Sequence, residues 1–350
     1  MKRILAGLWL DWTSRFGMIF LILAVLLSVF AYPLSTVKQP FANEVLAPLA
    51  LVEPGTKVLI LHFEKKEEIE VNSIFRGYSL FNQSIPVSSC INSAKEIRYL
   101  PFGLEDKGEN WKLISKPVEF QLENRVFYLG SDRFGRDLYS RLLIGSRISL
   151  AAGLIAVVIS LLIGVPLGAL AGYYGGWIDR IVSWFFQVVW SIPTLLLVIA
   201  LTLALGKGFW QVFVAIGLTM WVEVARVVRG EVLNQSVREY VTAARIMGFR
   251  HFYVLNKHVL PNSLAPLLII SSANFASAIL VESGLSFLGL GAQPPIPSWG
   301  NIIKDHYVYI IMGKPHLAIV PGVLIVLLVL SFMTIGNKLR DLLDTRALLN

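Results

Sequence analysis

The chain has 350 residues, of which 55% are hydrophobic and only 15% are charged. Soluble domains carry about a quarter charged residues, so this composition excludes a disordered chain, a nucleic-acid-binding domain and an ordinary soluble enzyme. It predicts a polytopic helical membrane protein, in which the net charge of +8 reflects basic residues in cytoplasmic loops.

Six segments are apolar enough to cross a membrane as helices. A helix rises about 1.5 Å per residue and must cross about 30 Å of hydrocarbon, so a span needs roughly 20 apolar residues. In chain order the predicted spans lie at about 16–32, within 148–178, within 181–206 around Pro193, at about 208–222, within 262–291 around Glu282, and at about 316–336. The predicted fold class is an all-α polytopic membrane protein with six transmembrane helices.

The distribution of basic residues predicts the orientation of these spans. Lys2, Arg3 and Arg15 precede the first span and also suit a signal peptide, but the long apolar run without a clean cleavage site favours an uncleaved span. With a cytoplasmic N-terminus, six spans place both termini in the cytoplasm. Thirteen basic residues then face the cytoplasm, and three lie on short outer loops: Lys207, Lys304 and Lys314.

The block between the first two spans, 33–147, is the long polar part of the chain. Lys57–Phe63 is rich in strand-forming residues and is followed by the charged run Glu64–Glu70, and Val126–Leu129 is a second strand-like segment. Because long domains cross the membrane largely regardless of charge, we expect a small mixed α/β or β extracytoplasmic insert. Two roles stay open for it: a decoration that packs on the membrane core, or a contact surface for an extracellular partner.

The sequence carries no catalytic or cofactor signature. Its five histidines form no closely spaced group with carboxylates, as a zinc or iron site needs. No nucleophile elbow, H-E-x-x-H pair or G-x-x-x-x-G-K-[ST] phosphate loop occurs. We therefore expect a transport protein that is not an enzyme, has no metal or cofactor of its own, and takes its energy from an ion gradient or another subunit.

Glu282 is the only charge well inside a predicted span. A carboxylate at the bilayer centre costs about 2.5–3.5 kcal/mol on insertion scales, so it faces protein or a water-filled path. It either contacts substrate in the pathway or packs between helices with a hydrogen bond near the interface. One such group is a weak basis for ion coupling.

The loop between the fourth and fifth spans predicts two short helices. Tyr240, Ala243 or Ala244, and Met247 recur at helical spacing, and Gly248 suits a helix end in the left-handed conformation. The second helix is expected over 249–259 and is stopped by Pro261.

Two short helices joined at a glycine would form a protruding knob. Because alanine side chains are small, one face of the knob could fit into a groove on a partner protein. The alternative is an interfacial helix that lies on the lipid.

The residues of this loop resemble the EAA loop of ABC importer permeases. That pattern is E-A-A, three residues, Gly, nine residues, a hydrophobic position, any residue and Leu-Pro. Ala243-Ala244, Gly248 and Leu260-Pro261 fit it, whereas Thr242 stands where the pattern has Glu. In the dipeptide/oligopeptide/nickel branch the glutamate sits in R-E-Y-V-x-A-A-R, which Arg238–Arg245 match.

Other segments resemble the same branch. They are Leu129–Asp137 with Ser140-Arg141 and Arg147–Leu150, Gly172–Asp179, Ser191–Thr194, Leu285–Gly291, Pro297–Gly300 and Arg340-Asp341. The resemblance covers about 126–346 and the first span, but not about 39–124.

This resemblance implies a permease subunit of an ATP-driven importer in the bacterial inner (plasma) membrane. Its expected partners are a second homologous permease, two cytoplasmic ABC ATPases that hold the ATP and Mg²⁺, an extracytoplasmic binding protein and the lipid bilayer. The residues expected to couple to the ATPases are Arg238, Glu239, Tyr240, Ala243, Ala244, Arg245, Gly248, His258, Leu260 and Pro261. The residues considered for the pathway or its outer mouth are Asp132, Gly135, Arg136, Asp137, Arg141 and Glu282.

Leu138–Leu150 is read as an amphipathic run with Arg141 and Arg147 on its polar side. It either contacts substrate or the binding protein, or forms an interfacial elbow that aims the second span.

The expected domains are 1–32 with the first span, 33–147 with the insert and the segment before the second span, and 148–350 with a five-helix core and the coupling loop at about 229–262. Peptides are the expected cargo. Nickel or another small solute is the alternative within the family, and an ion-coupled carrier or channel is the alternative outside it.

Overall fold

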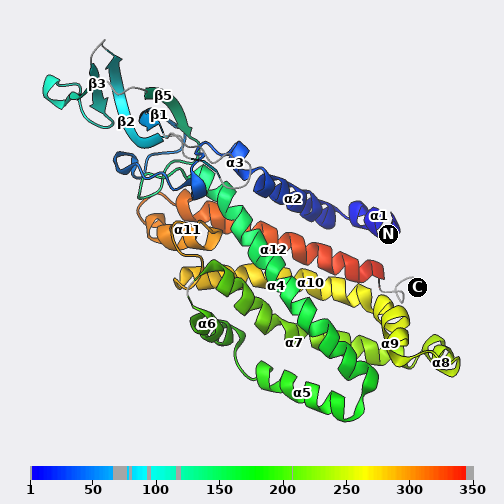
Figure 1. Ribbon diagram of the computed structural model, residues 1–350. Coiled ribbons are helices and arrows are strands. Elements are labelled where there is room, and N and C mark those ends of the chain that lie inside the picture. The colour runs from blue at the N-terminus through cyan, green and yellow to red at the C-terminus, as the bar shows by residue number, and fades with distance from the viewer. Residues whose placement is uncertain are drawn as a thin grey trace. The chain divides into compact units, whose positions relative to one another are not determined.

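The computed structural model describes residues 2–65, 77–78, 81–92, 96–115, 120–206 and 208–343 (Figure 1). Most of the predicted charged run Glu64–Glu70, together with Lys207 and Arg346, lies outside these residues. The chain divides into two compact units. The helical unit comprises 1–24, 149–293 and 323–350, and the sheet unit comprises 25–148 and 294–322.

The structure confirms a mostly helical chain with five to six candidate spans. Five helices are long and apolar enough to cross a membrane: α2 (Trp12–Val29), α4 (Leu138–Tyr174), α7 (Phe209–Ser236), the stretch His251–Phe287 that contains α9 (His251–Val254) and α10 (Leu264–Phe287), and α12 (His316–Leu343). The shorter helices among the described residues are α1 (Lys2–Leu10), α3 (Ala31–Leu34) and α11 (Trp299–His306). Another short helix, α8 (Glu239–Ile246), lies between α7 and α9.

The predicted third span is a bent pair of helices. α5 (Gly176–Trp190) and α6 (Thr194–Leu205) meet at an angle of 90° across a three-residue break. Pro193 ends the break, because it has no N–H for a helical hydrogen bond and sits directly before the first residue of α6. The predicted third span with Pro193 inside it is therefore broken at the proline, and it counts as one span only if the two helices are taken together.

A stripe of glycines on α4 lets this helix approach α7 closely. Gly164, Gly168 and Gly172 repeat every four residues, and a Cβ on any of them would collide with a backbone carbonyl oxygen of α7. Small residues at this spacing are typical of tightly packed membrane helices. The packing of α4 against α7 builds the centre of the helical unit.

The run Leu138–Leu150 is the first part of α4 and not an amphipathic segment beside it. Arg141 is 3% exposed, and most of its neighbours on the helix are buried too. One uninterrupted helix continues from Leu138 into the apolar stretch, and Arg141 lies on a buried side of it. Contact with substrate or the binding protein, and an elbow that aims the second span, both stay predictions.

The insert contains a five-stranded antiparallel sheet in the order β4-β3-β2-β1-β5. Its strands are β1 (Thr56–Lys65), β2 (Phe81–Asn92), β3 (Glu96–Pro101), β4 (Lys112–Ser115) and β5 (Phe120–Phe127). The predicted strand Lys57–Phe63 is confirmed, whereas Val126–Leu129 is a strand only as far as Phe127. Alternate residues of β1 enter two cores, with Val58 and Ile60 in one and Leu61 and Phe63 in the other.

The loop after α7 folds into α8 (Glu239–Ile246), α9, a π-helical turn (Leu255–Val259) and a 3₁₀ turn (Leu260–Ser263) that leads into α10. The expectation that Pro261 stops the second helix is wrong. The wider π turn and the tighter 3₁₀ turn accommodate the proline, so the helical path continues into α10.

Candidate functional site

The first candidate site is the knob, which we define as residues 238–262. Figure 1 shows α8 and α9 beyond the ends of α7 and α10, within the helical unit. The extended backbone of Arg238 starts α8, and the N–H groups of Val241 and Thr242 donate to its carbonyl oxygen.

Gly248 ends α8 in the predicted left-handed conformation, with φ of 83°. Its N–H donates to the carbonyl oxygen of Arg245 at 3.0 Å, and that of Phe249 donates to Ala244 at 3.3 Å. This pair of bonds is a Schellman motif, which turns the chain sharply from α8 into α9. Glycine favours the position because left-handed backbone crowds a Cβ.

One side of the knob is anchored on the helical unit. Val241 and Ala244 of α8 are at most 2% exposed, and Val254 and Val259 of the following turns are fully buried. They form one apolar cluster with residues of α4 and α7, such as Val228. The knob is therefore packed firmly against these two helices.

Polar contacts reinforce this anchor at both ends of the knob. The hydroxyl of Tyr240 donates to Gln235 on α7 at 2.7 Å and accepts from Asn262 at 3.2 Å. Arg245 lies over the ring of Tyr173 on α4, with 4.9 Å between guanidinium carbon and ring centroid. Sequence reasoning missed Tyr173 and Gln235 because both lie outside the loop motif.

The opposite side of the knob is apolar and exposed. Its exposed apolar residues are Ile246, Met247, Phe249, Phe252 and Tyr253. Phe252 is 72% exposed, and the rings of Phe249 and Tyr253 stack with centroids 5.2 Å apart. Of the residues expected to recur on the apolar face, Tyr240 and Met247 are exposed, whereas Ala244 is buried together with Val241.

The remaining predicted coupling residues lie around this exposed side. Arg238, Glu239, Ala243 and Pro261 are exposed, and His258 and Leu260 are half-buried. The ring of His258 packs edge-on against Tyr253 at 5.8 Å. The arrangement offers a partner an apolar surface with charged residues at its edge.

The predicted outer-mouth residues form a buried charged cluster in the sheet unit. Asp132 is fully buried and accepts hydrogen bonds from the backbone N–H groups of Phe134 and Arg136 and from Arg136 Nε at 2.6 Å. Asp137 Oδ2 accepts from Thr36 Oγ1 at 2.6 Å. A Cβ on Gly135 would collide with the carbonyl oxygen of Leu46.

This geometry gives the charged cluster an internal role in the sheet unit. Asp137 Oδ2 also accepts from the N–H of Ser140 in the first turn of α4, so it fixes the start of that helix. Arg141 lies 3.9 Å from Asp132 and is buried beside it. The alternative role of these residues in contacting substrate stays a prediction.

Glu282 lies inside α10 and is fully buried. Ser286, one turn further along, donates its hydroxyl to Glu282 Oε1 at 2.7 Å. These contacts favour a helix-packing carboxylate over a residue that lines an open pathway.

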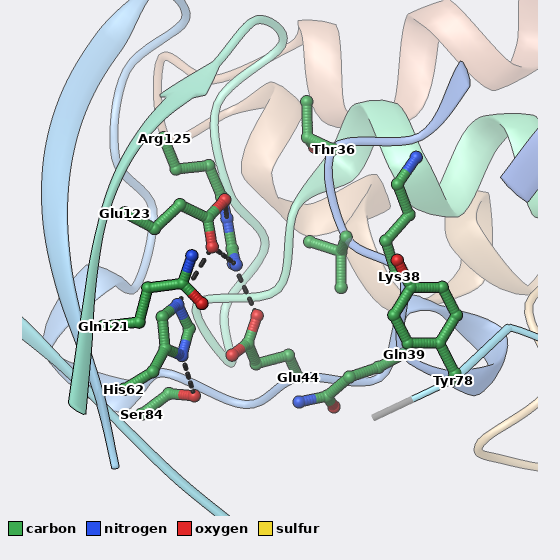
Figure 2. Close-up of a pocket in the computed structure, with 11 residues that line it drawn as sticks. Thr36, Lys38, Gln39, Glu44, His62, Tyr78, Ser84, Gln121, Glu123 and Arg125 are labelled. Carbon is green, nitrogen blue, oxygen red and sulfur yellow. Dashed lines mark hydrogen bonds and ion pairs between the residues drawn. The ribbon is translucent and has the colours of Figure 1, made fainter. Parts of the chain in front are cut away.

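A third candidate is a cavity of ≈ 250 Å³ in the sheet unit (Figure 2). Figure 2 shows His62, Glu123, Arg125 and Glu44 joined in a chain of hydrogen bonds along one wall. His62 Nε2 lies 2.9 Å from Glu123, and Arg125 NH1 donates to Glu44 at 2.5 Å. Burial raises the pKa of Glu123, but hydrogen bonds from His62 and Arg125 outweigh it and hold this pKa at about 2.

The charges of this cavity are therefore balanced inside the sheet unit. Lys38, which also lines it, donates to the carbonyl oxygens of Tyr32, Pro33 and Ser35, each at 2.8 Å. The wall stabilises the sheet unit and offers a ligand little unpaired charge.

Comparison with known proteins places the chain among transporter subunits. The family described as "Binding-protein-dependent transport system inner membrane component" matches residues 164–348. The glutathione transport system permease protein GsiD of Pectobacterium atrosepticum is 42% identical over 219 residues, which cover 63% of this chain and 72% of that protein. The dipeptide transport system permease protein DppC of Alkalihalophilus pseudofirmus is 39% identical over the same shares of each chain.

A solved MetNI methionine ABC transporter in an inward-facing conformation aligns with 57% of this chain and 95% of its own. The identity is 22% and the TM-score is 0.45.

Proposed function

The chain belongs to the family of binding-protein-dependent transport system inner membrane components and is a permease of an ABC importer, and on that premise we propose that its cargo is peptides. The observation that carries this proposal is the identity of about 40% to permeases named for dipeptides and for glutathione, itself a small peptide. Nickel or another small solute is the second candidate.

Permeases of this kind act with an ATPase and a binding protein. We further propose that this chain pairs with a second homologous permease and that the knob docks on one of two ATPase subunits. The exposed ring of Phe252 and the stacked pair Phe249 and Tyr253 support this assignment, because exposed apolar clusters mark protein contacts. The buried side of the knob would pass movement of the ATPases to α4 and α7 as a rigid-body shift.

The proposed topology has six spans, with α5 and α6 counted together, and both termini in the cytoplasm. The knob then faces the cytoplasm, and the six basic residues from Arg226 to Lys257, four of them within the knob, agree with the positive-inside tendency. The sheet unit lies outside, where it meets the binding protein or simply covers the membrane core.

Uptake of the labelled dipeptide alanyl-alanine into proteoliposomes tests the proposed function. We expect uptake only when this chain is assembled with its second permease, ATPases and binding protein, and only with ATP. Uptake by this chain alone along an ion gradient would favour the carrier alternative. Nickel uptake without dipeptide uptake by the assembled transporter would overturn the peptide assignment.

A further inference from the structure

A cavity of ≈ 230 Å³ lies where α5 breaks from α6, within the helical unit. Four helices contribute to its wall. The lining residues used below are Trp190 at the end of α5, Thr194 at the start of α6, Thr219 and Glu223 on α7, and Ser277 on α10. The lining residues lie between 189 and 281, and the cavity lies at the bend between α5 and α6.

Glu223 gives this cavity a negative side chain in the middle of α7. Because α7 runs from Phe209 to Ser236, Glu223 lies about 20 Å along the helix from either end. The predicted fourth span ended near Glu223, whereas the helix continues to Ser236. A carboxylate on a candidate membrane span is costly and is by default a candidate functional residue.

The carboxylate of Glu223 lies within the electrostatic influence of Arg226 but is not bonded to it. It is half-buried, and among the described residues no hydrogen bond or ion pair to it occurs. The nearest basic residue on its helix is Arg226, whose guanidinium carbon lies 3.3 Å from the ring centroid of Trp190. Arg226 is therefore held on the aromatic ring by a cation–π contact.

The start of α6 gives the same cavity a positive end. The first intrahelical bond runs from the N–H of Leu197 to the carbonyl oxygen of Pro193, which leaves the amides of the first turn free. No side chain caps this helix. Free amides and the helix dipole together attract an anion such as a carboxylate.

We propose that this cavity is a peptide-binding subsite of the permease. The ammonium group of a short peptide binds Glu223, and its terminal carboxylate binds the free amides at the start of α6. Hydroxyl groups of Thr219 and Ser277 supply hydrogen bonds along the wall. This inference rests on the proposed peptide cargo. It adds the reason for selectivity, because the subsite recognises both the free ammonium group and the free carboxylate of the peptide.

A thiol-protection experiment tests the subsite in the assembled, reconstituted transporter. Cys90 is the only cysteine of the chain, so Cys90→Ser with Ser277→Cys leaves one thiol, at the cavity. Its reaction with N-ethylmaleimide is followed by mass spectrometry of this chain, with alanyl-alanine or its N-acetylated form present. The matched control is Ser271→Cys, on the same helix but not on the cavity wall.

We expect alanyl-alanine to slow labelling at position 277 at least fivefold and labelling at 271 less than twofold. N-acetylation of the probe should weaken protection about tenfold, as should Glu223→Gln, because each removes one partner of a charge-assisted hydrogen bond. Glu223→Asp should keep the preference for the free ammonium group.

Two results would overturn the subsite: no protection at 277 by alanyl-alanine in a transporter that takes it up, or protection that Glu223→Gln leaves unchanged. Failure of the unmodified transporter to take up alanyl-alanine would instead overturn the proposed function, and the subsite with it.

Discussion

The sheet unit and the knob differ in which side chains they pair or bury and which they leave exposed. In the sheet unit, Glu123, Arg125 and Glu44 neutralise one another within the chain. In the knob, apolar rings such as Phe252 remain exposed although the same segment buries Val241 and Ala244 completely or nearly so. Charged groups therefore support the sheet unit internally, whereas the exposed aromatic side of the knob is the proposed docking surface for the ATPase.

The largest expected effect is on the internal support of the sheet unit. Arg125 and Glu44 are at most 7% exposed, so Arg125→Ala leaves a buried carboxylate without its partner and should lower the free energy of unfolding by about 3–5 kcal/mol. Thermal unfolding of the detergent-solubilised chain should show a Tm lower by roughly 10 °C. The double variant Arg125→Met with Glu44→Leu should recover much of this loss, and an unchanged Tm in Arg125→Ala would contradict internal support.

The knob should respond in transport and not in stability. Phe252→Asp places a charge on its exposed apolar side, which should lower ATP-driven uptake more than tenfold through loss of ATPase binding. The change in Tm should stay within about 2 °C because the side chain packs on nothing that it would disturb.

Leu113→Asp is the matched control in the sheet unit. Leu113 on β4 is 59% exposed and is also a large apolar residue. Uptake should fall less than twofold. An equal loss of uptake in both variants would erase the distinction between the two regions.

Substitution of Gly248 tests whether transport depends on the turn between α8 and α9, separately from the exposed apolar side of the knob. A Cβ there has open space around it, so Gly248→Val acts through the positive φ alone, at a cost of about 1–2 kcal/mol. Uptake should drop several-fold. Gly248→Asn should retain most uptake since asparagine tolerates this backbone, and equal activity of the valine variant would argue against a fixed angle between α8 and α9.

The smallest expected effect is on the stability of the sheet unit at low pH. The pKa of Glu123 is held at about 2, below its ordinary 4.5, so its contribution is complete above pH 4.5 and is lost as the pH falls through about 2. Because the side chain is 38% exposed, the contribution should stay below about 1 kcal/mol. An acid titration followed by tryptophan fluorescence should show a shallower loss for Glu123→Gln, and identical curves would contradict the pairing.

Hydropathy located most of the membrane-spanning helices because long apolar runs have few alternatives to burial in lipid. It ended the fourth span near Glu223, because polar residues follow Val222, whereas the helix itself continues to Ser236. It also missed β2, β3 and β4, each of which pairs with the strand next to it in the chain. The register of these strands is set by contacts between side chains on neighbouring strands, and the composition of a single segment does not reveal those contacts.

Within the candidate site, the sequence predicted what depends on single residues. The left-handed Gly248 is such a feature and is confirmed. The buried side of α8, with Val241 and Ala244, could not be predicted, because it depends on where α4 and α7 pack against this helix. The contacts of Tyr240 with Gln235 and Asn262 likewise require the folded arrangement.

Photo-crosslinking from the knob tests the central claim most directly. A benzophenone-bearing amino acid placed at Phe252 of the assembled transporter should, on irradiation, join this chain to an ATPase subunit, while the same probe at Leu113 should not. A probe at Phe252 that captures only lipid, in a transporter still active in ATP-driven uptake, would contradict the account.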